Sequence, residues 1–304
     1  MKVFLLFLPF VLSLTAYSQP VVKDRSANCI TYWKLGEKKT YSIVHEKSGS
    51  GENVRPIRFI YNALVSVIDS TAESYTVRWE FQLPDIFKEL HPHIADSLPV
   101  YDGMQMIFRI SEMGAFIELL NWEEVKDAYI RQTEMPLSRH MDSTAKAVLA
   151  ATEQMFSSKQ VVESALIKEI QLFHKPYGYQ FTTKEESETT QLPNPFGGAP
   201  FPARQTYQLT TLDEAKDAFA LVVRLTIDKG DINSLMEPLL QRMNIKKNAE
   251  IEAAKEQMKN YDMQDYAEYH FVRSTGWLTR LFYKRSVSMG KNKQWESFTI
   301  ELKN

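Results

Sequence analysis

The segment from Tyr75 to Phe81 alternates strictly between large apolar and polar side chains. Positions 75, 77, 79 and 81 carry Tyr, Val, Trp and Phe, and the positions between them carry Thr, Arg and Glu. Because successive side chains on a strand point to opposite sides, this pattern predicts a strand with one buried face. Several more such segments predict a sheet that is covered on one side.

Other segments of strand character recur along the chain, and Gly-containing or polar turns separate several of them. They begin near Thr40 and continue at 58–68, 104–110, 115–120, 177–190, 203–212, 217–227, 268–273, 277–286 and 294–302. Consecutive strands joined by such short turns favour antiparallel pairing.

Helical patterns are inserted between these strands at about 120–135, 142–174 and 233–262. Asn121, with Glu124 three residues later, resembles a capping box, and we expect Pro136 to end the helix that follows. In the second segment, Ser157 is a second capping candidate and predicts a break between two helices. Apolar residues at 162, 166, 170 and 173 form a stripe that is typical of a buried helix face.

These elements together predict an α+β fold, mainly antiparallel β-sheet, curved or half-barrel-like, with inserted helices. We expect a single β-rich domain over 19–304. A weak internal echo, in which both 107–120 and 270–282 read as strand, Gly turn and strand, allows two similar halves joined by the Pro/Gly loop 191–203.

The N-terminus resembles a secretory signal peptide over residues 1–18. Met1-Lys2 is followed by an apolar run, Val3–Leu14, and by small residues at Ala16 and Ser18. The run is shorter than the roughly 20 residues of a membrane span. We therefore expect export to the periplasm or the extracellular space, cleavage near Ser18-Gln19, and a soluble mature chain without a transmembrane segment.

Composition excludes some classes of partner and bond. The chain carries 36 basic and 38 acidic residues, so there is no basic excess to suggest nucleic-acid binding. Cys29 is the only cysteine and cannot form an internal disulfide. It also lies too far beyond the apolar run to be a lipid-attachment site. With 44% hydrophobic residues, the chain can build a large core.

Motifs for catalysis or cofactor binding are lacking. No nucleophile elbow, phosphate-binding loop or dinucleotide glycine pattern occurs in the sequence. The one close histidine pair, His91 and His93, is a weak candidate for a metal site, with Asp85, Glu89 or Asp96 nearby as a third ligand. We expect no cofactor and no enzymatic activity, and we interpret the pair as surface residues.

Aromatic residues are the remaining candidates for ligand contacts. Phe196 and Phe201 lie on the Pro/Gly loop 191–203 and suit a lid, although they could equally pack over the sheet edge. Trp79 and Trp277 lie in predicted strands, where such rings either fill a core or line an apolar binding cavity. Core packing is the commoner role of buried aromatic rings.

The sequence resembles exported proteins of Bacteroidota that have no assigned function. The resemblance rests on Ala16–Gln19, Trp33–Gly36 followed by Tyr41, and Ile110–Gly114 leading to Asn121–Glu124. It implies an exported single domain and no catalytic residue. The predicted architecture also resembles the half-barrel periplasmic lipoprotein carriers, whose concave face holds acyl chains.

Three functional hypotheses follow, in this order. The first is a non-catalytic protein that binds an apolar small molecule, a lipid or another envelope-derived ligand, and it predicts a cavity lined by aromatic residues. The second is a structural or interaction protein that binds an envelope protein, and it predicts a filled core. The third is a hydrolase whose active site is assembled from distant residues.

Overall fold

The computed structural model describes residues 25–48, 56–83, 103–137, 142–192, 200–227, 261–289 and 292–303. The signal-like segment 1–18 and most of the helix expected over 233–262 lie outside these ranges. Only the end of that helix falls within them, and there Asp262 begins a strand.

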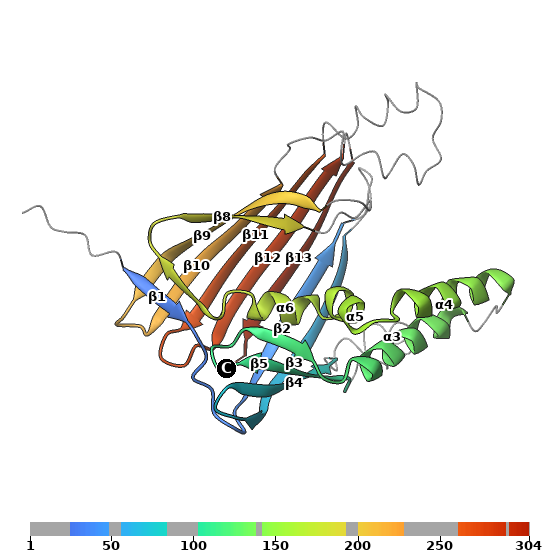
Figure 1. Ribbon diagram of the computed structural model, residues 1–304, viewed down its shortest axis with the longest axis horizontal. Coiled ribbons are helices and arrows are strands. Elements are labelled where there is room, and N and C mark those ends of the chain that lie inside the picture. Colours follow the sequence, from blue (N-terminus) through green and yellow to red (C-terminus); the bar gives the residue numbers. More distant parts are fainter. Residues whose placement is uncertain are drawn as a thin grey trace, which may run out of the picture.

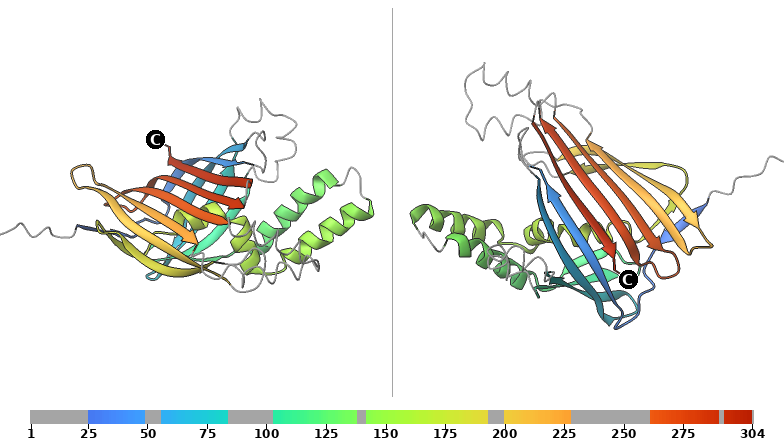
Figure 2. Two further views of the ribbon diagram at one scale, coloured as in Figure 1. Left: turned by 90° about the horizontal axis from the view of Figure 1, so that it is seen from above. Right: turned by 180° about the vertical axis from the view of Figure 1, so that it is seen from behind.

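The main element is one continuous antiparallel sheet of 11 strands in the order β6-β5-β4-β3-β2-β13-β12-β11-β10-β9-β8 (Figure 1). Its strands are β2 Lys38–Lys47, β3 Ile57–Ser70, β4 Ser74–Gln82, β5 Gln105–Ser111, β6 Phe116–Leu119, β8 Glu186–Leu192, β9 Phe201–Asp213, β10 Ala218–Ile227, β11 Asp262–Val272, β12 Leu278–Met289 and β13 Asn292–Leu302. The sheet is strongly curved, as seen from above and from behind (Figure 2). The predicted α+β, mainly antiparallel fold is confirmed.

The strands of the sheet that come first and last in the sequence, β2 and β13, pair with each other. β2 pairs with β13 from Tyr41↔Leu302 to Lys47↔Glu296, so strands from both ends of the chain meet at its centre. The strands on either side of the Pro/Gly loop are neighbours in the sheet. Leu192 of β8 pairs with Phe201 of β9 at its edge. The division into two similar halves stays a prediction.

Four described helices follow β6: α3 Trp122–Leu137, α4 Ser143–Met155, α5 Lys159–Leu166 and α6 Lys168–His174. α6 lies across the concave face of the sheet, whereas α3 and α4 form a hairpin that extends beyond it (Figures 1 and 2). The predicted break within 142–174 is confirmed. Its cap is Ser158, whose side chain accepts a hydrogen bond from the Val161 N–H, and not the expected Ser157.

Asn121 does not act through the predicted capping box. Its Oδ1 accepts a hydrogen bond from the Ile107 N–H at 2.8 Å, and its Nδ2 donates to the Gln105 carbonyl at 2.9 Å and to Glu124 at 3.1 Å. The side chain therefore fastens the start of α3 to β5. Pro136 lies within α3, which ends at Leu137, so the proline is tolerated in the last turn.

The concave face of the sheet forms the core. Val77, Trp79 and Phe81 are all buried there, as the alternation in β4 predicts. The register places Trp79 opposite Val65 of β3 and Met106 of β5, so apolar side chains of neighbouring strands form continuous rows. Such rows need a cover, and α6 supplies it.

One end of this core is closed by the chain just before β2. Residues Ser26–Cys29 form β1, which pairs with β7, Tyr179–Thr182, in a separate two-stranded sheet. Trp33 then stacks on Trp277 with ring centroids 3.9 Å apart. None of the described helices is long and apolar enough to cross a membrane.

Candidate functional site

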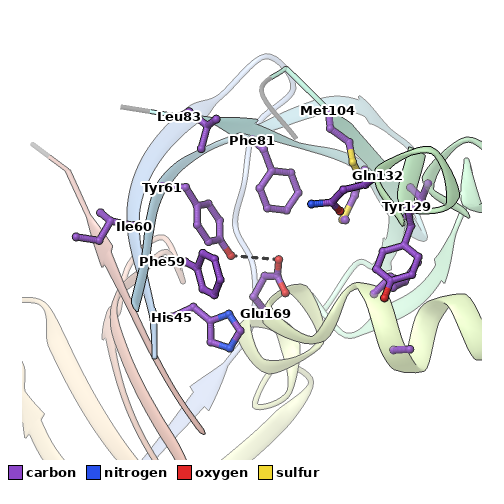
Figure 3. A pocket seen from close by; sticks show the side chains of 14 residues that line it. His45, Phe59, Ile60, Tyr61, Phe81, Leu83, Met104, Tyr129, Gln132 and Glu169 are labelled. Atoms are coloured by element: carbon purple, nitrogen blue, oxygen red, sulfur yellow. Dashed lines mark hydrogen bonds between the residues drawn. The ribbon is translucent and has the colours of Figure 1, made fainter. Parts of the chain in front are cut away.

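A cavity of about 320 Å³ lies between the helices and the first half of the sheet (Figure 3). The residues that line it come from β2, β3, β4, β5 and the segments beside β4 and β5, and from α3, α5 and α6. They are His45, Phe59, Ile60, Tyr61, Phe81, Leu83, Met104, Met106, Val125, Tyr129, Gln132, Ala165, Leu166 and Glu169. We call this the helix–sheet cavity.

Strand and helix periodicity explain why these side chains converge. Phe59 and Tyr61 are two residues apart on β3 and therefore point to the same side of the sheet. On α3, Val125, Tyr129 and Gln132 follow the spacing of one helix face. A sheet face and a helix face meet here without filling the space between them.

Among the described residues that line the cavity, Glu169 is the one carboxylate. It is 9% exposed, and its Oε1 accepts a hydrogen bond from the Tyr61 hydroxyl at 3.2 Å. Burial raises the pKa of the Glu169 carboxyl, against the lowering effect of the hydrogen bonds. A buried carboxyl beside an apolar space can accept hydrogen bonds from a ligand.

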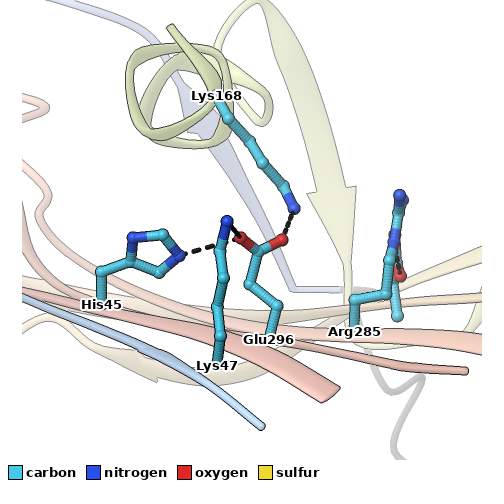
Figure 4. A network of polar contacts seen from close by, with 6 residues as sticks. His45, Lys47, Lys168, Arg285 and Glu296 are labelled. Atoms are coloured by element: carbon cyan, nitrogen blue, oxygen red, sulfur yellow. Dashed lines mark hydrogen bonds and ion pairs between the residues drawn. The ribbon is translucent and has the colours of Figure 1, made fainter. Parts of the chain in front are cut away.

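A charged cluster fastens α6 to the sheet beside the cavity (Figure 4). The Glu296 carboxylate of β13 accepts hydrogen bonds from His45 Nε2 at 2.8 Å and from Lys168 of α6, and it forms an ion pair with Lys47 at 3.0 Å. Burial alone would raise the pKa of Glu296, but these partners outweigh it and hold the pKa well below its usual range. Burial lowers the pKa of Lys168.

The charged cluster continues across the sheet from β13 to the neighbouring strands β12 and β11. Arg285 of β12, opposite Glu296, forms a two-pronged pair with Asp265 of β11 through two contacts of 2.7 Å. The hydrogen bonds to Asp265 raise the pKa of Arg285. Further along, Lys175 donates to Gln205 at 2.8 Å. Lys168 of α6 and Lys175, which directly follows α6, are thus both bonded to side chains of the sheet.

Trp79 and Trp277, two of the predicted aromatic contacts, are not among the described residues that line the helix–sheet cavity. Trp79 is 0% exposed and packs edge-on against Phe173 of α6, and Trp277 is 1% exposed and stacks on Trp33. Both fill the core. Phe201 begins β9, and Phe196 lies outside the described residues.

The weak metal candidates His91 and His93 also lie outside the described residues. Within the described part of the chain, no group of three or more His, Cys, Asp or Glu side chains could hold a metal ion. Cys29 is fully buried, and that burial raises the pKa of its thiol.

Sequence reasoning missed the polar residue of the cavity. Leu166, Ile170 and Phe173 were expected as a buried stripe, and Ile170 and Phe173 are indeed buried. Glu169 lies within that stripe, three residues after Leu166 and directly before Ile170. A carboxylate embedded in an apolar helix face was the available signal for a site.

No protein-family model and no curated protein matches the chain.

Proposed function

We propose that this protein binds an apolar or amphiphilic ligand in the helix–sheet cavity, as a non-catalytic binding or carrier protein. The observation that carries the proposal is the cavity itself, which stays open between α3, α5, α6 and β2–β5 beside a well-buried core. A structural role needs no such space.

The lining supports an apolar occupant. Phe59, Phe81, Met106 and Leu166 present hydrocarbon, ring or thioether surface to the cavity. Its volume of about 320 Å³ falls at the lower end of the range of roughly 300–1,000 Å³ that is common for small-molecule sites. An unbranched chain of moderate length fits such a space better than a large globular ligand.

Export forms part of the same proposal. The signal-like segment ending near Ser18-Gln19 directs the chain to the periplasm or the extracellular space, where an envelope-derived lipid is an available ligand. Mass determination of the chain recovered from outside the cytoplasm gives the test. A mature N-terminus at Gln19 is expected, and a retained segment 1–18 would contradict cleavage.

Native mass spectrometry of the exported chain tests the binding role. We expect a reproducible extra mass that disappears on organic extraction. The rim residue Ala165 of α5 is exposed, so A165W should project a large ring over the cavity and abolish the extra mass without disturbing the core.

The matched control is A151W, the same substitution at an exposed position of α4 that does not line the cavity. It should retain the extra mass. A clean mass for the native chain would count against the carrier role, and an excess equal to zinc would direct attention to His91 and His93.

A further inference from the structure

An acidic residue of the helix–sheet cavity, Glu169, is placed where it can distinguish ligands of equal chain length by their polar head groups. Glu169 reaches the cavity from α6, and the Tyr61 hydroxyl holds it from β3 at 3.2 Å (Figure 3). Gln132 of α3 points into the same space. Most of the other lining residues are apolar, so Glu169 offers its carboxyl to a mainly apolar space.

No lysine or arginine is among the described residues that line the cavity. His45 is the one basic side chain among them, and its Nε2 is already paired with Glu296 at 2.8 Å. Lys168, the nearest lysine in sequence to Glu169, is also bound to Glu296. A ligand carrying a negative charge would therefore enter beside a carboxyl group with no unpaired cation on the lining to receive it.

We propose that the ligand is a single-chain amphiphile with a neutral or cationic hydrogen-bond donor at its head, a hydroxyl or an ammonium group, and that Glu169 receives this donor. The inference deepens the proposed binding function and rests on it. Glu169 acts here as a specificity-determining residue, because its carboxyl oxygens accept a hydrogen bond from such a head in either protonation state.

An anionic head is disfavoured in both states of Glu169. Beside the ionised carboxylate it meets a like charge. Beside the neutral acid it gains one hydrogen bond from the acid O–H but no counter-ion in place of its lost hydration. A head that can accept but not donate leaves the ionised carboxylate without a new partner. Discrimination of this kind arises from the repulsive contact as much as from the attractive one.

Competition among four ligands with one decyl chain tests the proposal. Decanol, decylammonium, decanoate and the methyl ether of decanol would each displace the neutral fluorophore N-phenylnaphthylamine from the full mature chain at neutral pH. We expect decanol and decylammonium to compete about tenfold better than decanoate and the ether. Equal or stronger competition by decanoate would overturn the inference.

Glu169→Gln supplies the variant test, since it keeps the shape of the side chain and removes the acid. It should shrink the preference for decylammonium over decanoate to about threefold or less. Glu153→Gln, at an exposed position of α4, is the matched control and should leave the preference unchanged. If Glu169→Gln fails to fold, the competition among the four decyl compounds in the unmodified chain still tests the proposal.

The outcomes separate this inference from the proposed function. If neither the fluorophore nor any decyl compound binds, the binding function itself fails. If all four compounds compete equally, and A165W abolishes their binding, the cavity binds apolar chains but Glu169 does not select the head, and only the inference is lost.

Discussion

Two glycines explain how the closed end of the core is built. Gly114 and Gly276 lie in the β5–β6 and β11–β12 turns and have φ angles of +96° and +69°, in the left-handed region. Their carbonyls accept hydrogen bonds from His174 Nδ1 at 2.9 Å and from the Tyr177 hydroxyl at 2.7 Å. Each turn can pack this closely against the neighbouring chain only because its glycine lacks a Cβ, which would clash with Thr31 and Tyr177 at Gly114 and with Ile30 at Gly276.

Gly276→Ala should therefore be strongly destabilising. An added Cβ would lie 1.9 Å from the Ile30 carbonyl oxygen, so the substitution combines backbone strain with a clash against main chain. We expect a loss of at least about 3 kcal/mol in the free energy of unfolding, measured by denaturant titration.

Gly36→Ala is the matched control for this prediction. Gly36 has a similar φ of +81°, but an added Cβ would meet nothing within 4 Å, so only the backbone strain of about 1 kcal/mol should appear. Equal losses for the two variants would show that the contact with Ile30 is not what makes Gly276 necessary.

At the scale of elements, each helix is fixed by a few local groups and by the surface it covers. Asn121 ties α3 to β5, Ser158 begins α5, and Lys168 binds α6 to β13. Val162 and Ile170 are fully buried, so the apolar faces of α5 and α6 supply most of their stability. A side-chain cap sets where α5 begins, whereas α6 begins without one.

Ser158→Ala should destabilise the protein by about 0.5–1 kcal/mol, because the Val161 N–H loses its side-chain acceptor. Ser157→Ala is its control and should change the free energy of unfolding by less than about 0.5 kcal/mol, since Ser157 is exposed and precedes the cap. Chemical denaturation of both variants measures the difference. A larger loss of unfolding free energy for Ser157→Ala than for Ser158→Ala would mean that Ser157, the residue expected from the sequence, caps α5.

At the scale of the whole molecule, folding brings titratable groups from helices and distant strands into the interior. His174 is 2% exposed and lies among Trp33, Phe108 and Tyr177, and burial lowers its pKa to about 4 despite the bond to Gly114. In the unfolded chain the same imidazole titrates near 6.5. The unfolded state therefore binds this proton at a higher pH than the folded state.

Global stability should consequently fall as the pH drops from about 6.5 to about 4, by roughly 1 kcal/mol per pH unit from His174 alone. The depressed pKa of Glu296 adds a further loss below about pH 4.3, whereas the raised pKa of Glu169 acts in the opposite direction. Urea titrations across this range measure the slope.

His174→Gln should flatten the slope between pH 6.5 and pH 4, and Glu296→Gln should act only at lower pH. An unchanged slope in His174→Gln would mean that another group governs acid sensitivity. Both variants will be less stable at neutral pH, so the pH dependence and not the absolute stability is the measurement that decides.

Local sequence patterns predicted most of the described elements and the class of the fold. Alternation in Tyr75–Phe81 predicted β4, and the apolar stripe through Ile170 and Phe173 predicted a buried helix face, because side-chain direction follows directly from backbone periodicity. The turn at Gly276 was likewise predicted from the residue that permits it.

Only the tertiary structure decided which side chains meet. The pairing of β2 with β13 places His45 beside Glu296, 251 positions away in the chain, and no local signal encodes that distance. The same holds for Tyr61 and Glu169, and for the burial of Trp79 in the core instead of a cavity. The helix–sheet cavity depends on how completely two packed faces fill the space between them, and packing is a property of the whole assembly of side chains.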